Sequence, residues 1–217
     1  MINKTYYINL DHRTDRREYF LKNFCKEIKA ERISAVYGEE LQIENLNENI
    51  ITLEGKEDSI NKEKPIYPFL TKGAIGCALS HKNIWEKILK EKYERTLILE
   101  DDINIVENFK QKLYLILEKY NEFDIHYLGH HHVSGGAYKI DSQEILRRPK
   151  IIYGTFGYVV NNKAAEELLK IFPITHQIDY EMRRAYKNLK VAVIRKKLVL
   201  SEQSKVSKMG TDIQIRN

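Results

Sequence analysis

The sequence has little cysteine, and no segment of it has the pattern of a signal peptide or a membrane-spanning helix. Its two cysteines, Cys25 and Cys77, lie far apart and form no metal-binding spacing, which favours reduced thiols in a cytosolic core. The N-terminal MINKTYYINLDHR becomes polar too early for a signal peptide, and no apolar run approaches the ~20 residues of a membrane span. We therefore expect a cytoplasmic protein, with any membrane contact being peripheral and on the inner face.

The signatures of several other classes are also missing. Internal repeats and low-complexity linkers are absent, which predicts one domain over residues 1–217. The chain has no P-loop ending in Gly-Lys, and no Asp-x-Asp follows its first strand-like segment. His130, His131 and His132 are adjacent and lack the i, i+4 spacing of a helical zinc site, so we place them in a loop at the rim of a cleft.

The composition is that of an ordinary globular protein, with 42% hydrophobic and 31% charged residues in a chain of 217. The formal net charge of +5 is mild and suits a polyanionic small molecule or an anionic membrane surface as well as nucleic acid. The basic residues are spread along the chain and form no stripe, which argues against nucleic acid as the partner.

Strand-like and helical patterns alternate along the chain. The strand-like segments are Thr5–Leu10, Ile33–Tyr37, Thr96–Leu99, Phe123–Leu128, Ile151–Val160 and Lys190–Leu200. Helical periodicity covers Glu18–Lys29 (capped by Thr14 or Asp15), Leu70–Lys90 (capped by Thr71), Phe109–Tyr120, Lys163–Ile171 and Asp179–Lys190. This alternation predicts one α/β domain with a mostly parallel central sheet flanked by helices, and residues 39–64, polar and aperiodic, as a surface excursion with at most a short helix.

Three consecutive acids end an apolar strand in LILEDDINI. In an open α/β sheet, ligands bind beyond the carboxyl ends of the strands. Because strand side chains alternate, Glu100 and Asp102 are expected to point one way and Asp101 the other. Two carboxylates on one side suit Mg²⁺ or Mn²⁺ that carries a diphosphate. The alternative is an exposed acidic turn without a ligand.

An arginine-rich loop follows the first strand. Arg13, Arg16 and Arg17 stand beside a helix N-terminus, where guanidinium groups and free amides suit the phosphates of a nucleotide. The alternative is a solvated, charged helix face.

These segments together resemble glycosyltransferase family 25, the lipopolysaccharide and lipooligosaccharide galactosyltransferase family that also includes the collagen galactosyltransferase domains. Residues 9–17 (NLDHRTDRR) are similar to its opening signature. Similar blocks follow in family order at 32–38 (RISAVYG), 70–81 (LTKGAIGCALSH), 97–102 (LILEDD), 154–158 (GTFGY), 164–169 (AAEELL), Pro173, 178–181 (IDYE) and 210–213 (GTDI). They span nearly the whole chain.

The resemblance implies a GT-A type nucleotide-sugar fold and inverting transfer of a hexose, most often β-galactose, from a UDP-sugar donor. The acceptor it implies is a lipid-linked glycan in lipopolysaccharide, lipooligosaccharide or capsule synthesis. The acidic triplet takes the place of the family's metal-binding DxD motif, with Asp102 as the first ligand of Mn²⁺ or Mg²⁺ and Glu100, a departure from the motif, as the second, directly or through water. The implied donor-binding residues are Asn9, Leu10, Arg13, Arg16, Arg17, Ala35, Val36, Ser80, His81, Glu100, Asp101, Gly154, Thr155, Gly157 and Tyr158.

An inverting transfer is one displacement at the anomeric carbon, so it needs a base for the acceptor hydroxyl. We predict Asp179 as this base and Glu181 as secondary, with a helix N-terminus favouring the ionised Asp179; a helix cap and a solvated Glu181 are the alternative. Gly154 and Gly157 are expected to allow close approach to a sugar, on whose face Tyr153, Phe156 or Tyr158 stacks.

Two other functions compete with this one. A metal-dependent phosphatase or nucleotide hydrolase also uses acids at a strand end, and a non-catalytic polyanion-binding module would suit the sequence pI of about 8.9.

Overall fold

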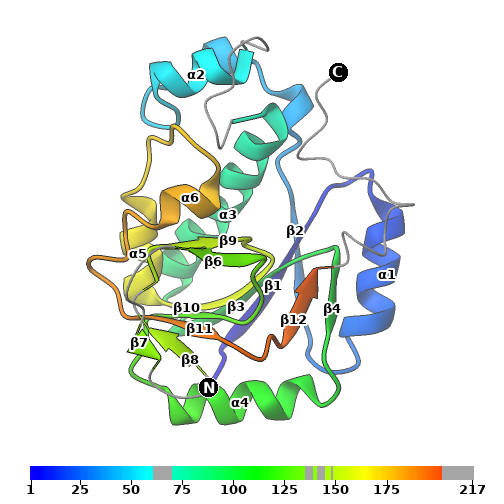
Figure 1. The fold of residues 1–217 in the computed structure, drawn as a ribbon. Helices are drawn as coiled ribbons and strands as arrows, with labels where there is room; N and C mark the ends of the chain where they lie inside the picture. Colours follow the sequence, from blue (N-terminus) through cyan, green and yellow to red (C-terminus); the bar gives the residue numbers. More distant parts are fainter. Residues whose placement is uncertain (61–69, 135–138, 141–144, 148, 202–217) are drawn as a thin grey trace.

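The structure is a computed structural model that describes residues 1–60, 70–134, 139–140, 145–147 and 149–201 (Figure 1). The block at 210–213 lies outside the described residues. The sequence also predicts that Arg195–Lys208, which carries five Lys or Arg residues, contacts anionic lipid, and the part of this segment beyond Ser201 lies outside the described residues too.

An eight-stranded sheet forms the centre of the molecule, in the order β2-β1-β3-β10-β5-β11-β8-β7. The strands are β1 (Lys4–Asn9), β2 (Glu31–Ser34), β3 (Arg95–Glu100), β5 (Ile125–Tyr127), β7 (Lys139–Ile140), β8 (Ile145–Arg147), β10 (Gly157–Asn161) and β11 (Val191–Ile194). β10 runs antiparallel to both of its neighbours, β3 and β5, and β8 runs antiparallel to β11. The other strands share one direction, so the predicted mostly parallel sheet is confirmed.

Two small sheets change the predicted strand pattern. β4 (Ile103–Ile105) pairs with β12 (Val199–Ser201), and β6 (His132–Ser134) pairs with β9 (Ile151–Tyr153). The predicted strand Ile151–Val160 is therefore wrong as one element: β9 and β10 lie in different sheets, because Gly154, with φ of +100°, turns the chain between them. The predicted strand Lys190–Leu200 likewise divides into β11 and β12.

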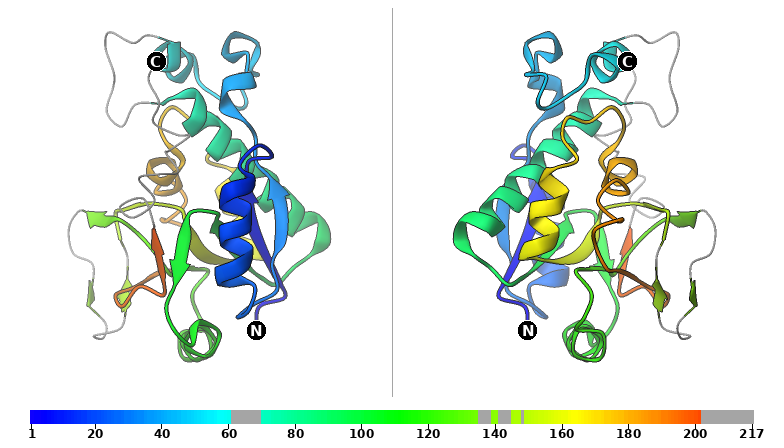
Figure 2. Two further views of the ribbon diagram at one scale, coloured as in Figure 1. Left: turned by 90° about the vertical axis from the view of Figure 1, so that its right-hand side faces the viewer. Right: turned by 90° about the vertical axis from the view of Figure 1, so that its left-hand side faces the viewer.

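Helices cover both faces of the central sheet. α3 (Lys72–Glu91) and α5 (Asn162–Leu169) lie side by side on one face, as Figures 1 and 2 show, and pack on Tyr6, Ile98 and Tyr158. α1 (Thr14–Phe24) and α4 (Phe109–Lys119) contribute to the core on the other face, around Tyr7 and Leu97. Neighbouring strand residues such as Tyr6 and Tyr7 thus enter opposite cores, as the pleat requires.

The helix boundaries differ most from the predicted ones in α1 and α6. α1 begins after Arg13 without a side-chain cap, so the predicted caps Thr14 and Asp15 are wrong, and it ends at Phe24 instead of Lys29. α6 (Ile178–Met182) covers only the beginning of the predicted helix Asp179–Lys190. The Thr71 cap of α3 is confirmed, because its hydroxyl accepts from the Ala74 amide at 3.1 Å.

The segment after β2 forms two 3₁₀ turns, η1 (Gly38–Glu40) and η2 (Ile43–Asn45), and the short α2 (Leu53–Ile60), drawn at the top of Figure 1. Ile43 and Ile51 are buried, and Ile51 forms a β-bridge with Ile174, so apolar contacts fix this excursion to the core. Within the described residues, none of the helices combines the length and the apolar character that crossing a bilayer requires.

Candidate functional site

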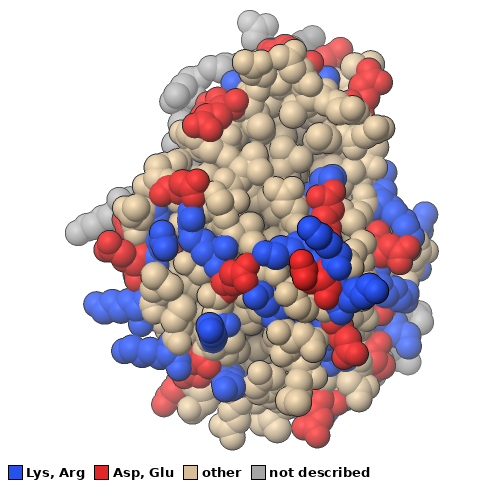
Figure 3. Space-filling view, turned by 180° about the vertical axis from the view of Figure 1, so that it is seen from behind, with Lys and Arg blue, Asp and Glu red and all other residues tan. Residues whose placement is uncertain are grey.

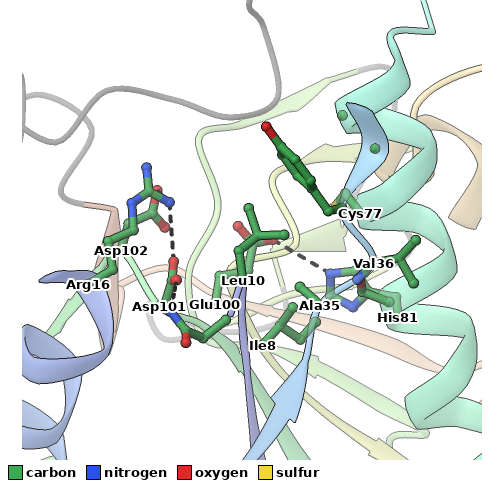
Figure 4. Close-up of a pocket in the computed structure, with 15 residues that line it drawn as sticks. Ile8, Leu10, Arg16, Ala35, Val36, Cys77, His81, Glu100, Asp101 and Asp102 are labelled. Carbon is green, nitrogen blue, oxygen red and sulfur yellow. Dashed lines mark hydrogen bonds and ion pairs between the residues drawn. The ribbon is translucent and has the colours of Figure 1, made fainter. Parts of the chain in front are cut away.

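A pocket lies where β1, β2 and β3 end and α3 begins (Figure 4). Its wall contains the predicted metal ligand Asp102 and these predicted donor-binding residues: Asn9, Leu10, Arg16, Ala35, Val36, Ser80, His81, Glu100 and Asp101. The chain crossings of a parallel sheet bring their four sequence blocks to one edge. Cys77 also lines the pocket, a position that sequence reasoning did not predict.

The acidic triplet divides into two parts at the end of β3. Asp101 accepts from Asn9 Nδ2 at 2.7 Å, and Arg16 Nη1 lies 3.2 Å from Asp101 Oδ1 and 3.5 Å from Asp102 Oδ2. Glu100 instead accepts from the Thr155 hydroxyl at 2.8 Å. The prediction that Asp101 points away from Glu100 and Asp102 is therefore wrong: β3 ends at Glu100, both aspartates lie beside Arg16, and all three acids line the same pocket.

The charges of the triplet are incompletely balanced by side chains. Burial, and then the neighbouring Glu100, raise the pKa of Asp102 to about 7 against the effect of Arg16. Burial also raises the pKa of Asp101, whereas for Glu100 the effects of His81 and Thr155 outweigh burial and lower the pKa. Among the described residues that line the pocket, Arg16 is the one Lys or Arg beside three carboxyl groups.

A hard divalent cation fits this donor set. Carboxylate oxygens are the ligands that Mg²⁺ and Mn²⁺ prefer, and a cation would offset the negative charge that Arg16 leaves. Asp102 and Glu100 are the residues that would hold it.

The arginine loop brings one of its three predicted arginines into the pocket. Arg13 is buried and binds Asp15 with two hydrogen bonds, Nε to Oδ1 at 3.0 Å and Nη2 to Oδ2 at 2.9 Å. Arg17 is exposed and does not line the pocket. The predicted phosphate contacts of Arg13 and Arg17 are thus not supported by their placement, because Asp15 competes for Arg13.

Arg32 orients the Asn9 side chain beside the acidic triplet, a role that the sequence reasoning missed. Its Nε donates to Asn9 Oδ1 at 2.8 Å, which leaves the Nδ2 of the same amide to face Asp101. The available signal was its place at the start of the block RISAVYG, on the strand that pairs with β1, where Arg32 lies opposite Tyr7, two residues before Asn9.

The predicted nucleotide wall, Ala35 and Val36, sits directly on α3. Ser80 Oγ accepts from the Val36 amide at 2.8 Å and donates to the Gly76 carbonyl at 2.7 Å, so this hydroxyl holds the wall in place. A Cβ on Gly76 would lie 2.5 Å from the Val36 carbonyl oxygen. Only glycine permits this contact between the loop and the helix.

The aromatic residues of the GTFGY block are core residues. Tyr158 and Phe156 are buried, so the predicted stacking of either ring on a sugar is wrong. A Cβ on Gly157 would lie 2.8 Å from Val199, so this glycine admits β12 and not a sugar. Tyr158 Oη lies 2.7 Å from His81 Nδ1 and accepts from Trp85 Nε1 at 3.1 Å.

The two predicted catalytic acids have different surroundings. Asp179 accepts from the amides of Gly154 at 3.0 Å and Tyr180 at 2.8 Å, and burial raises its pKa, contrary to the predicted stabilisation of its ionised form. Glu181 is 3% exposed and accepts from the amides of Thr175 and His176, from the His176 ring and from Arg184. Neither acid lines the pocket, and the closed network around Glu181 argues against its predicted catalytic role.

The comparison with known families decides what kind of protein this is. Residues 2–182 match the family described as glycosyltransferase family 25 (LPS biosynthesis protein). The chain belongs to glycosyltransferase family 25.

Relatives of this family-25 chain include animal proteins. It is 34% identical over 176 residues to a glycosyltransferase 25 family member of Anopheles gambiae, covering 78% of this chain and 29% of the relative. It is 30% identical over 174 residues to procollagen galactosyltransferase 2 of Homo sapiens, covering 76% and 27%. The chain thus spans less than a third of the length of these relatives.

Among solved structures, A197 from STIV is similar to this family-25 chain with 12% sequence identity and a TM-score of 0.46. The matched region covers 89% of this chain and 82% of A197.

Proposed function

We propose that this family-25 domain is an inverting galactosyltransferase that moves a hexose from a UDP-sugar to a saccharide hydroxyl. Family membership and the relatives named procollagen galactosyltransferase support the reaction class. The observation that carries the proposal is the acidic triplet, with its buried Asp101 and Asp102 beside Arg16, at the sheet edge where nucleotide ligands bind.

The donor is proposed to lie along the pocket wall. The loop at Ala35 and Val36 faces the nucleoside, and Arg16 faces the diphosphate. Mn²⁺ or Mg²⁺ held by Asp102 and Glu100 would neutralise charge on the departing diphosphate. The raised pKa of Asp102 supports this, because a carboxyl group in this surrounding ionises more readily beside a cation.

Asp179 is proposed as the base that receives the proton of the acceptor hydroxyl. Two backbone amides fix its carboxyl group, and a raised pKa makes the carboxylate a stronger proton acceptor.

The acceptor substrate is proposed to be a lipid-linked glycan at the inner face of the cytoplasmic membrane.

The experiment is a panel of UDP-sugars in a thermal-shift assay, with and without Mn²⁺, followed by transfer to oligosaccharide acceptors. We expect UDP-galactose to stabilise the fold in a Mn²⁺-dependent way and to release UDP when an acceptor is added. Stabilisation by none of the UDP-sugars, or release of inorganic phosphate in place of UDP, would contradict the proposal; the second result identifies a hydrolase.

The face drawn in Figure 3 does not favour the polyanion-binding alternative. On this face Lys and Arg are mixed with Asp and Glu across the lower half, and the charged groups near the top are mostly Asp and Glu. A polyanion needs a stripe of one sign.

A further inference from the structure

We infer that Trp85 and Tyr158 fix the proton of His81 on its Nε2 atom, so that His81 presents an N–H to Glu100 and positions this carboxylate electrostatically. His81 is then a positioning residue and not a metal ligand. The inference rests on the proposed function only where it assigns Glu100 to the donor site.

The placement of the proton follows from counting donors and acceptors. Trp85, Tyr158 and His81 are each fully buried. The indole Nε1 of Trp85 can only donate, and it lies 3.1 Å from Tyr158 Oη, so Tyr158 is the acceptor there.

The proton of Tyr158 itself must then go to another acceptor. Within the described part of the chain, the remaining hydrogen-bond partner of Tyr158 Oη is His81 Nδ1, at 2.7 Å. Nδ1 therefore accepts, and a neutral His81 carries its proton on Nε2. With the proton on Nδ1, the Tyr158 hydroxyl would be a buried donor without an acceptor, which proteins avoid.

The protonated Nε2 faces the acidic triplet. It lies 3.6 Å from Glu100 Oε1, just beyond hydrogen-bond distance, and has no hydrogen-bond partner among the described residues, and Figure 4 shows the ring directed at Glu100 from α3. Thr155 Oγ1 already donates to the same Oε1 at 2.8 Å. The Thr155 hydroxyl in the turn before β10 thus bonds this carboxylate oxygen, and the His81 N–H on α3 faces the same oxygen from the other side.

The same atoms could suggest a transition-metal site. One ligand atom each of Cys77, His81 and Glu100 lies within 4.8 Å of the others, and Cys77 and His81 have the i, i+4 spacing of helical metal sites. Coordination requires the lone pair of Nε2, which the proton occupies. Moving that proton to Nδ1 would leave the Tyr158 proton unpartnered, so Trp85 and Tyr158 together disfavour metal binding.

The first test reads the proton directly. In ligand-free protein labelled with ¹⁵N-histidine, long-range ¹H–¹⁵N spectra assign His81 by the signal that is lost in His81→Gln. We expect one protonated and one unprotonated ring nitrogen, with the proton on Nε2. A proton on Nδ1, or an imidazolium with two protonated nitrogens, would overturn the inference.

The second test uses a matched pair of variants. Tyr158→Phe removes the hydroxyl that fixes the tautomer. Tyr127→Phe is the control: it removes an equally buried hydroxyl, which bonds the Tyr186 hydroxyl at 2.7 Å, from a ring that stacks on Tyr158. Outer partners of metal ligands typically contribute 10–100-fold to metal affinity or activity. We expect Tyr158→Phe to lower kcat and the apparent Mn²⁺ affinity by about tenfold or more, with KM for the sugar donor little changed. Tyr127→Phe should leave all three values near wild type, and equal losses in both variants would show a merely structural role.

Conservative replacement and zinc separate positioning from coordination. His81→Gln keeps an amide donor at the place of Nε2 and should retain more kcat than His81→Leu. In calorimetry with Zn²⁺ alone, we expect wild-type protein to bind no zinc tightly. Tight zinc binding that is lost in Cys77→Ser would establish a metal site at Cys77, His81 and Glu100 and would overturn the inference. If wild-type protein transfers no sugar and binds no UDP-sugar, the proposed function fails, while the spectra still decide the proton on His81.

Discussion

The carboxyl group of Asp102 is the residue-scale feature on which cation binding depends. Burial and Glu100 oppose its ionisation. We expect Asp102→Asn to abolish the Mn²⁺-dependent thermal shift and sugar transfer, and to leave the ligand-free fold as stable as wild type or more so, because a like charge is removed. Glu107→Gln, on an exposed residue, is the control. Full activity of Asp102→Asn, or of the wild type in excess EDTA, would exclude the cation.

Asp179 and Glu181 should separate into a chemical and a structural residue. Asp179→Asn should keep UDP-sugar affinity and lose kcat by about 10²–10⁴-fold. Glu181→Gln should lower the free energy of unfolding by about 2–4 kcal/mol, because a buried charge-assisted network is broken, with kcat per folded molecule preserved. Steady-state kinetics and urea titrations of both variants check this. A dead but stable Glu181→Gln, beside an active Asp179→Asn, would reverse the roles.

At the residue scale, the sequence predicts which residues come together in the pocket, but it does not predict which side chains form hydrogen bonds or ion pairs with one another. Asn9, Ala35 and the triplet reach one pocket because they lie at the ends of parallel strands, and Arg16 reaches it from the first turn of α1. The sequence cannot show that Asp15 binds Arg13, or that Tyr158 turns into the core, because both outcomes depend on competition among side chains that only the packed structure resolves.

At the scale of elements, the contact between β10 and β12 makes a sharp test of packing. A Cβ on Gly157 would lie 2.8–2.9 Å from three side-chain atoms of Val199. Gly157→Ala should therefore lower the free energy of unfolding by about 1–3 kcal/mol. Adding Val199→Ala should restore part of this loss, so that the double variant is more stable than the sum of the single changes; urea unfolding of all four proteins measures the coupling. Strict additivity would show that the two residues do not meet.

The sequence predicts the types of most elements and misses their boundaries where glycine and backbone pairing decide. α3 and its Thr71 cap follow from periodicity and a capping side chain. The division of 151–160 does not, because a continuous apolar run gives no sign that Gly154 turns with positive φ and sends each half to a different sheet.

At the scale of the whole molecule, a buried histidine links stability to pH. His126 Nε2 bonds the Tyr120 carbonyl at 2.8 Å, and burial lowers the pKa of His126 to about 4. In the unfolded chain the imidazole binds a proton near pH 6.5. The contribution of His126 to the free energy of unfolding is therefore complete above that pH and is lost as the pH falls toward 4. The loss is on the order of 3 kcal/mol for this group.

Urea titrations at pH 7 and pH 5 test this linkage. His126→Gln, which keeps an amide donor for Tyr120 but does not titrate, should lose less stability between the two pH values than wild type. His132→Gln, on an exposed residue, should behave as wild type. Equal pH dependence in wild type and His126→Gln would contradict the prediction.

The position of β10 sets the order in which the chain can complete its fold. β3 ends at Glu100, and the strand that covers its free edge, β10, begins only at Gly157. During synthesis the strands that form the pocket therefore emerge with the β3 edge still unpaired, and this edge is open to pairing with other chains. The hydrogen bond between His81 and Tyr158 also cannot form until Tyr158 has been synthesised. The pocket residues come from the first half of the sequence, yet the ribosome must deliver the second half before they can be held in place.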